Sequence, residues 1–137
     1  MNINVVGTSG SGKSTLARRL AHRLGLRWIE LDCLYWRPNW QGTPDEAFFA
    51  AIAAATATPG WVLDGNYNRS RGAKWREVDL VIWLDYGLWR TLRQAVWRAA
   101  SRAWRQQELW PGTGNRESFR RSFCSRESII LWTLKTW

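Results

Sequence analysis

Residue types that build many common functional sites are scarce in this chain. Its 137 residues include only two cysteines, Cys33 and Cys124, and one histidine, His22. The cysteines have no CxxC or metal-ligand spacing, so we expect reduced, structural cysteines, although the sequence leaves a disulfide between them open. A mononuclear zinc site or a Ser/His/Asp triad has little material here.

Long apolar runs are also absent. None approaches the roughly 18–20 residues of a membrane-spanning helix. Only six residues precede the first glycine-rich segment, so we expect no signal peptide. We therefore expect a cytoplasmic protein with no membrane partner. Its length and its hydrophobic content of 45% predict one folded domain spanning residues 1–137.

Positive charge and tryptophan are in excess. The formal net charge is +9, twelve residues are tryptophan, and seventeen of the twenty basic residues are arginine. Residues 65–137 hold fourteen basic and six acidic side chains, against six and five in residues 1–64. Because arginine presents a planar fork suited to phosphate, we expect the second half to meet an anion. Charge alone does not choose between a nucleotide, a nucleic acid and an acidic surface.

Short apolar segments alternate with helical periodicity along the chain. Strands are predicted at 2–6, 28–31, 61–63 and 80–84, and helices at about 16–24, 44–58, 88–108 and 116–134. Residues 33–42 are predicted as loop, and Thr43, Pro44 and Glu46 predict a capping box at the start of the second helix. The alternation predicts an α/β fold, with a parallel sheet, helices on its faces and ligands beyond the carboxyl ends of its strands.

Residues 7–14 read GTSGSGKS and match the phosphate-binding P-loop pattern GxxxxGK[ST]. Glycines let successive backbone N–H groups converge on one anion, and the following helix adds the partial positive charge of its N-terminus. Lys13 is expected to reach the β- and γ-phosphates of ATP, and Ser14 to offer its hydroxyl to Mg²⁺. The expected nucleotide-binding residues are Gly7, Thr8, Ser9, Gly10, Ser11, Gly12, Lys13, Ser14 and Thr15.

Three aspartates, Asp32, Asp64 and Asp85, each follow a predicted strand. A P-loop enzyme needs an acid at such a position to orient its metal ion, and we favour Asp64 because Gly65 after it permits close approach of a ligand. Asp85 is equally consistent with capping the next helix. Asp32 is expected to bind or deprotonate an acceptor hydroxyl, or simply to begin a turn.

With these residues in place, the sequence resembles the adenylate-kinase-like P-loop proteins of the topology modulation type. The segments that carry the resemblance are GTSGSGKSTLARRLA at 7–21, LDxxYWxPNW at 31–40, WVLDGNY at 61–67, VIWLDY at 81–86 and a stretch at 108–132. The resemblance implies a nucleoside-monophosphate-kinase-like sheet of order 2-3-1-4-5. It also implies ATP and Mg²⁺ as cofactors, with Lys13, Asp32 and Asp64 in catalysis and a nucleoside monophosphate or similar small acceptor. Only four strands are predicted, so the C-terminal fifth strand is expected to be missing.

The same resemblance implies a mobile lid at about 105–126, whose arginines close on the phosphates. Arg116 and Arg120 are expected to act in catalysis, and Arg121 and Arg126 to bind the nucleotide. Further candidates are Arg93 and Arg98, on the helix that enters the lid, and Arg69 or Arg71, because Asn66-Tyr67-Asn68-Arg69 stands where adenylate kinases have Phe-Pro-Arg. The alternative for any one arginine is a solvated basic face.

The tryptophans divide by position. Those in predicted strands, expected in the core, are Trp28, Trp61 and Trp83. Those on the long helix, expected to pack against the sheet or the lid, are Trp89, Trp97 and Trp104. Trp36 and Trp40 are expected either to stack on a base or sugar, or to pack their own loop closed.

Two functional classes remain. The first is an ATP-dependent phosphotransferase, and the second is a nucleotide-dependent nucleic-acid-binding or regulatory protein that uses the basic half on a phosphate backbone. Arginines that converge on the P-loop would favour the first class. Arginines spread over an outer face would favour the second.

Overall fold

The computed structural model describes residues 1–67, 70, 72 and 75–118. Its strands are β1 (Asn2–Gly7), β2 (Arg27–Glu30), β3 (Trp36–Arg37), β4 (Gln41–Gly42), β5 (Trp61–Asp64) and β6 (Leu80–Leu84). Its helices are α1 (Lys13–Leu24), α2 (Leu31–Tyr35), a short 3-10 helix (Pro38–Trp40), α3 (Asp45–Thr56) and α5 (Leu88–Arg105). The chain forms two compact units. We call residues 1–7, 12–37 and 41–84 the sheet unit, and residues 8–11, 38–40 and from 85 onward the α5 unit.

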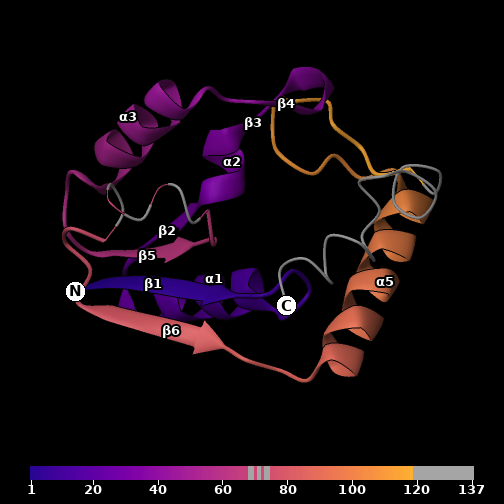
Figure 1. The fold of residues 1–137 in the computed structure, drawn as a ribbon, viewed down its shortest axis with the longest axis horizontal. Coiled ribbons are helices and arrows are strands. Elements are labelled where there is room, and N and C mark those ends of the chain that lie inside the picture. Colours follow the sequence, from indigo (N-terminus) through magenta and orange to yellow (C-terminus); the bar gives the residue numbers. More distant parts are fainter. Residues whose placement is uncertain (68–69, 71, 73–74, 119–137) are drawn as a thin grey trace. The chain divides into compact units, whose positions relative to one another are not determined.

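The sheet unit is built on a four-stranded parallel sheet of order β2-β5-β1-β6 (Figure 1). Counted along the chain, these four strands have the order 2-3-1-4, as the resemblance implies. A separate two-stranded antiparallel sheet pairs β3 with β4. Residues 33–42 therefore hold the end of α2 and two short strands, and the expectation of a loop there is wrong. Strands of two residues are too short to leave a periodic signal in the sequence.

Helices cover both faces of the sheet (Figure 1). Alternate residues of a strand point to opposite faces. On β5, Val62 packs with β1 and α1, whereas Leu63 packs with α2 and α3. The buried members of the first cluster are Ile3, Val5, Ala17, Ala21 and Val62, and those of the second are Leu31, Phe48, Ile52, Trp61 and Leu63. The α/β architecture expected from the sequence is confirmed.

The capping box expected at Thr43 is absent. Helix α3 begins at Asp45, Pro44 occupies the N-cap position, and no side chain caps the helix. The Thr43 hydroxyl instead donates to the carbonyls of Leu34 (3.3 Å) and Tyr35 (2.8 Å) at the end of α2. The Thr43 hydroxyl, which the sequence spacing predicts as the cap of α3, thus bonds to the end of α2 instead.

Two of the three strand tryptophans are not in the core. Trp61 is fully buried, but Trp28 is 38% exposed and Trp83 is 70% exposed. Trp61 lies on the inner strand β5, whereas Trp28 and Trp83 lie on β2 and β6, the outer strands of the described sheet. The prediction of a core role is correct for Trp61 and wrong for the other two.

The expected packing of the α5 tryptophans is also wrong. Trp89, Trp97 and Trp104 are between 77% and 82% exposed. The buried residues of α5 are small and recur every four positions, namely Thr91, Ala95, Ala99 and Ala103. Trp40 packs edge-to-face on Trp110, with 5.5 Å between ring centroids, and Trp36 does so on Tyr35 at 5.0 Å. These contacts favour loop packing for both tryptophans.

Residues 116–118, the part of the last predicted helix that the structure describes, are not helical. The rest of that helix and the expected loss of a fifth strand fall on residues 119–137, outside the described residues. Within the described residues, every helix is too short or too polar to cross a bilayer.

Candidate functional site

The carboxyl ends of the parallel strands bring the candidate residues of the sheet unit to one edge. Strand β1 ends at Gly7, and β5 ends at Asp64, which is paired in register with Val5 of β1 and Glu30 of β2. Asp32 follows β2 as the second residue of α2. This is the edge at which open parallel sheets bind their ligands.

The start of the phosphate-binding segment is anchored within the sheet unit. The Asn66 carboxamide accepts from the N–H of Gly7 at 3.0 Å and donates to its C=O at 2.6 Å. Gly12 then forms the N-cap of α1 without a side-chain cap. Lys13, Ser14 and Thr15 open this helix, whose first turn carries no acidic residue. The N–H groups and dipole of such a helix start favour an anion.

The middle of the segment, residues 8–11, belongs to the α5 unit. Ser11 N–H donates to the carbonyl of Thr8 at 3.2 Å and closes a turn. Gly10 has φ +87°, and a Cβ there would lie 2.8 Å from Cβ of Ala95 on α5, so only glycine fits. Arg98 of α5 places Nη2 3.4 Å from Oγ of Ser9. An arginine on α5 thus lies beside this segment, and the expected role of Arg98 toward the phosphates stays a prediction.

Asp32 is held by a hydrogen bond that spans 35 residues of sequence. The Tyr67 hydroxyl donates to Asp32 Oδ1 at 2.5 Å. The Tyr67 ring packs against Tyr35 and Phe48, with centroids 4.9 and 5.1 Å away. The phenol is therefore oriented by packing and fixes one carboxylate oxygen of Asp32. Asp32 lies within α2, and its expected role toward an acceptor hydroxyl stays a prediction.

Asp64 is buried, with 3% of its surface exposed, and the next residue explains part of the local geometry. Gly65 has φ +140°, and a Cβ there would lie 2.9 Å from Cβ of Leu31. Only glycine lets the chain turn away from β5 so close to α2. The side chains of Asp64 and Ser14 supply hard oxygen donors in the sheet unit, and such donors suit Mg²⁺. This ion usually keeps several waters and binds one or two carboxylates together with substrate phosphates. In the described part of the chain, no group of three or more His, Cys, Asp or Glu side chains could hold a metal ion.

The shifted pKa of the Cys33 thiol reflects the negative charge at this edge of the sheet. Its pKa is raised from 9.0 to about 12, first by burial and then by the carboxylates of Glu30, Asp32 and Asp64. Three carboxylates near one thiol make this part of the sheet edge negative. A divalent cation or the cationic side chains of a phosphate site would offset that charge.

The arginines expected in the lid are described only in part. Arg116 is exposed, and it lies opposite Glu108 in an isolated antiparallel bridge. Burial raises the pKa of Glu117, and Arg102 and Arg98 oppose that rise. Arg69, Arg71, Arg120, Arg121 and Arg126 lie outside the described residues, and their expected roles stay predictions.

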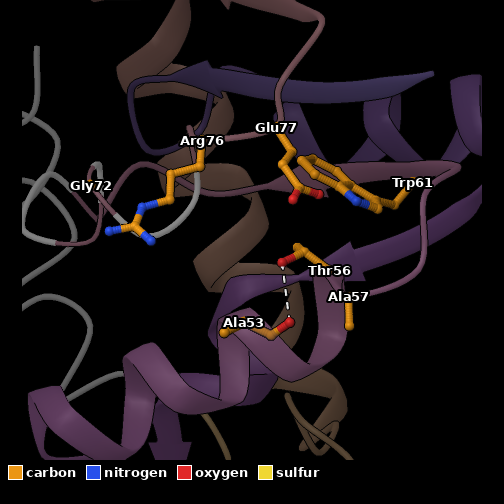
Figure 2. Close-up of a pocket in the computed structure, with 7 residues that line it drawn as sticks. All are labelled: Ala53, Thr56, Ala57, Trp61, Gly72, Arg76 and Glu77. Atoms are coloured by element: carbon orange, nitrogen blue, oxygen red, sulfur yellow. Dashed lines mark hydrogen bonds between the residues drawn. The ribbon is translucent and has the colours of Figure 1, made fainter.

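The contributions of Asn66 and Tyr67 to the site are not predicted from the sequence. The contacts of Asn66 and Tyr67 could not be read from a pattern, because their partners lie 59 and 35 residues away. The available signal was a polar Asn-Tyr pair directly after a buried strand and Asp-Gly. A separate cavity of about 380 Å³ lies at the start of β5, the end opposite Asp64, and is not part of this edge (Figure 2).

Comparisons with known proteins agree with the fold. No family model matches the chain. A gluconokinase from Sinorhizobium meliloti superposes with a TM-score of 0.55 and 20% identity, covering 98% of this chain and 73% of that one. The fold is that of a P-loop kinase. The sequence is 32% identical to shikimate kinase of Rippkaea orientalis in an alignment that covers 64% of this chain and 54% of that protein.

A second curated relative matches a shorter segment. Over 39 residues, 28% of the chain, the sequence is 49% identical to a bifunctional pantoate ligase/cytidylate kinase of Gloeobacter violaceus, of which 8% is covered. The chain thus spans about half the length, or less, of the curated relatives it matches. The chain thus has both the fold of a P-loop kinase and sequence similarity to proteins named as kinases.

Proposed function

We propose that this chain is an ATP- and Mg²⁺-dependent phosphotransferase that moves the γ-phosphoryl group of ATP to a small acceptor. The observation that carries the proposal is the shared sheet edge. There Gly7 leads into the P-loop, Lys13 and Ser14 open α1, and Asp64 ends the neighbouring strand. The likeness to proteins named shikimate kinase, cytidylate kinase and gluconokinase supports the same activity.

Different residues of the site bind the phosphates and the metal ion. The helix start at Lys13 and the Lys13 ammonium bind and neutralise the phosphate chain, and Ser14 and Asp64 would hold Mg²⁺. Such an ion would offset the negative charge of the phosphates. The acceptor oxygen forms a bond to the γ-phosphorus while the bond to the β–γ bridging oxygen breaks, and ADP leaves. Positioning and charge neutralisation supply most of the rate.

A hydroxyl acceptor fits the site better than a phosphate acceptor. A phosphate acceptor needs no base, whereas a hydroxyl must lose its proton during transfer. Tyr67 holds Oδ1 of Asp32, and Oδ2 would take that proton. Shikimate kinase and gluconokinase are named for hydroxyl-bearing substrates, and cytidylate kinase for a nucleotide. We therefore place small polyhydroxy acids ahead of nucleoside monophosphates as the acceptor.

A coupled assay of ADP release tests the proposal. The wild-type protein is offered ATP and Mg²⁺ with shikimate, gluconate or cytidine monophosphate, and Lys13→Ala is the matched control. We expect one acceptor to stimulate ADP release and Lys13→Ala to lower that rate by about 100-fold or more, the usual effect of removing one charge-stabilising group. Asp32→Asn should lower turnover of a hydroxyl acceptor about 100-fold or more but spare a phosphate acceptor.

The second candidate is nucleotide-dependent binding of nucleic acid. Helix α1 and the residues up to Arg27 favour it, because the exposed residues Arg18, Arg19, Arg23 and Arg27 lie in a stretch with no acid. DNA binding that weakens steeply with salt, together with no acceptor-stimulated ADP release, would replace the kinase proposal with this one.

Three narrower expectations belong to the same proposal. The lid at about 105–126 would close Arg116, Arg120, Arg121 and Arg126 over the phosphates, within a single kinase-like domain. The topology modulation type is supported by the segments at 31–40, 61–67 and 81–86. A cytoplasmic location would supply ATP.

A further inference from the structure

One carboxamide holds both backbone groups of the residue that begins the P-loop. Asn66 Oδ1 accepts from the Gly7 N–H, and Asn66 Nδ2 donates to the Gly7 C=O. Gly7 is buried and Asn66 half-buried. Water therefore replaces these partners poorly, and a buried backbone group without a partner is unfavourable.

The two bonds begin where the backbone ladder of the sheet ends. Strands β1 and β5 pair in register up to Val5 and Asp64, and the N–H of Gly65 donates to the carbonyl of Val5 at 3.4 Å. Continued by two residues, the same register would set Asn66 opposite Gly7. There the side chain, which carries one donor and one acceptor, takes the place of a backbone unit. On the other side of β1, Gly7 lies opposite Leu84 in the register of the parallel pair β1 and β6.

The chemistry selects asparagine at this position. Aspartate would set a second acceptor against the Gly7 carbonyl, and alanine would leave both groups of Gly7 unpaired. Glutamine would displace the carboxamide by one methylene. The neighbouring Tyr67 holds Asp32, so two successive side chains after β5 fix two separate parts of the site.

A phosphate-binding loop binds more tightly when its N–H groups are already aimed at the anion, because an unfixed loop must be ordered on binding. We propose that Asn66 is a positioning residue that fixes the entry of this loop and thereby raises the affinity for ATP. The inference rests on the proposed function, since it assumes that the P-loop binds ATP.

Nucleotide affinity in the absence of an acceptor tests this role. The full chain and its Asn66→Asp and Asn66→Ala variants are titrated with a non-hydrolysable ATP analogue and Mg²⁺ by calorimetry. Asn39→Asp is the matched control, because Asn39 is exposed and the change in charge is the same. We expect Asn66→Asp to raise Kd about 10- to 100-fold, which is about 1.4 to 2.7 kcal/mol, and Asn39→Asp to leave it within about twofold.

Amide exchange by NMR gives a second measurement that does not depend on the nucleotide. In the wild-type protein the Gly7 amide should exchange slowly, and in Asn66→Ala it should exchange faster while the Val5 amide stays protected. This local change distinguishes a loosened loop entry from general destabilisation, and it decides the question if Asn66→Asp does not fold.

The outcomes separate the two proposals. If the wild type binds the analogue and both folded Asn66 variants bind it equally well, the positioning role is wrong and the kinase proposal stands. A Gly7 amide that exchanges in the wild type as fast as an exposed amide also overturns the role. If the wild type does not bind the analogue at all, the proposed function fails and this inference fails with it.

Discussion

The hydrogen bond from Tyr67 to Asp32 yields a sharp prediction about acceptor turnover. Tyr67→Phe removes one oxygen atom and leaves the ring in its packing against Tyr35 and Phe48. The structure therefore allows the bond to be deleted with little change to the core. Asp32 stays in place but loses the donor that orients Oδ1.

The expected size of the effect follows from the partners. A hydrogen bond to a charged group contributes about 1.5 to 3 kcal/mol. Asp32 is half-buried, so a water molecule can replace part of the lost bond, and the lower end of that range applies. About 1.4 kcal/mol corresponds to a factor of ten, so kcat/KM for a hydroxyl acceptor should fall about tenfold. Affinity for ATP should not change.

A double-mutant cycle isolates this interaction. Acceptor kcat/KM is measured for the wild type, Tyr67→Phe, Asp32→Asn and the double variant, with Tyr86→Phe as a control for loss of a tyrosine hydroxyl elsewhere. If Tyr67 acts through Asp32, Tyr67→Phe should have little further effect in the Asp32→Asn background. Additive effects of the two changes, or an unchanged kcat/KM in Tyr67→Phe, would refute the reasoning.

Three further predictions concern packing and titration. Gly65→Ala should destabilise the protein by about 2 kcal/mol or more in urea unfolding, because its Cβ would meet Leu31; the control Gly87→Ala, with open space around it, should change stability by less than about 1 kcal/mol. Thr43→Val should cost about 1 kcal/mol in the same assay by removing the donor to the end of α2, and unchanged stability would count against that contact. The pKa of Cys33 is raised to about 12, so the protonated thiol contributes fully to protein stability below pH 9, and this contribution is lost as the pH rises toward 12. Iodoacetamide should therefore label Cys33 slowly at pH 9 in the folded protein. Fast labelling of Cys33 at pH 9, resolved by peptide mass spectrometry, would contradict this.

Much of the framework could be predicted because it depends on local sequence. Each of the four sheet strands is a short apolar run beside a segment with helical periodicity. The P-loop pattern lies directly between β1 and α1. The resemblance to adenylate-kinase-like proteins then supplied the strand order 2-3-1-4, which periodicity alone cannot give. The chain's likeness to a gluconokinase structure agrees with that fold.

The errors share a physical cause. A tryptophan in an apolar strand is buried only if the strand has neighbours and covered faces, and the sequence does not say which strands are outermost. Trp61 on β5 and Trp83 on β6 look alike in sequence, yet one is fully buried and the other is 70% exposed. Thr43 shows the same limit, because a hydroxyl near a helix start binds whichever carbonyl the fold brings closest.

By itself, then, the sequence determined the α/β class, the position of the P-loop pattern and the acids that follow the strands, because each of these depends on neighbouring residues. Only the tertiary structure decided that Asn66 holds Gly7 and that Tyr67 holds Asp32. These partners are 59 and 35 residues apart, and parallel pairing of β1, β2 and β5 brings them to one edge. The scarcity of histidine and cysteine had already indicated that a mononuclear zinc site or a Ser/His/Asp triad has little material in this chain.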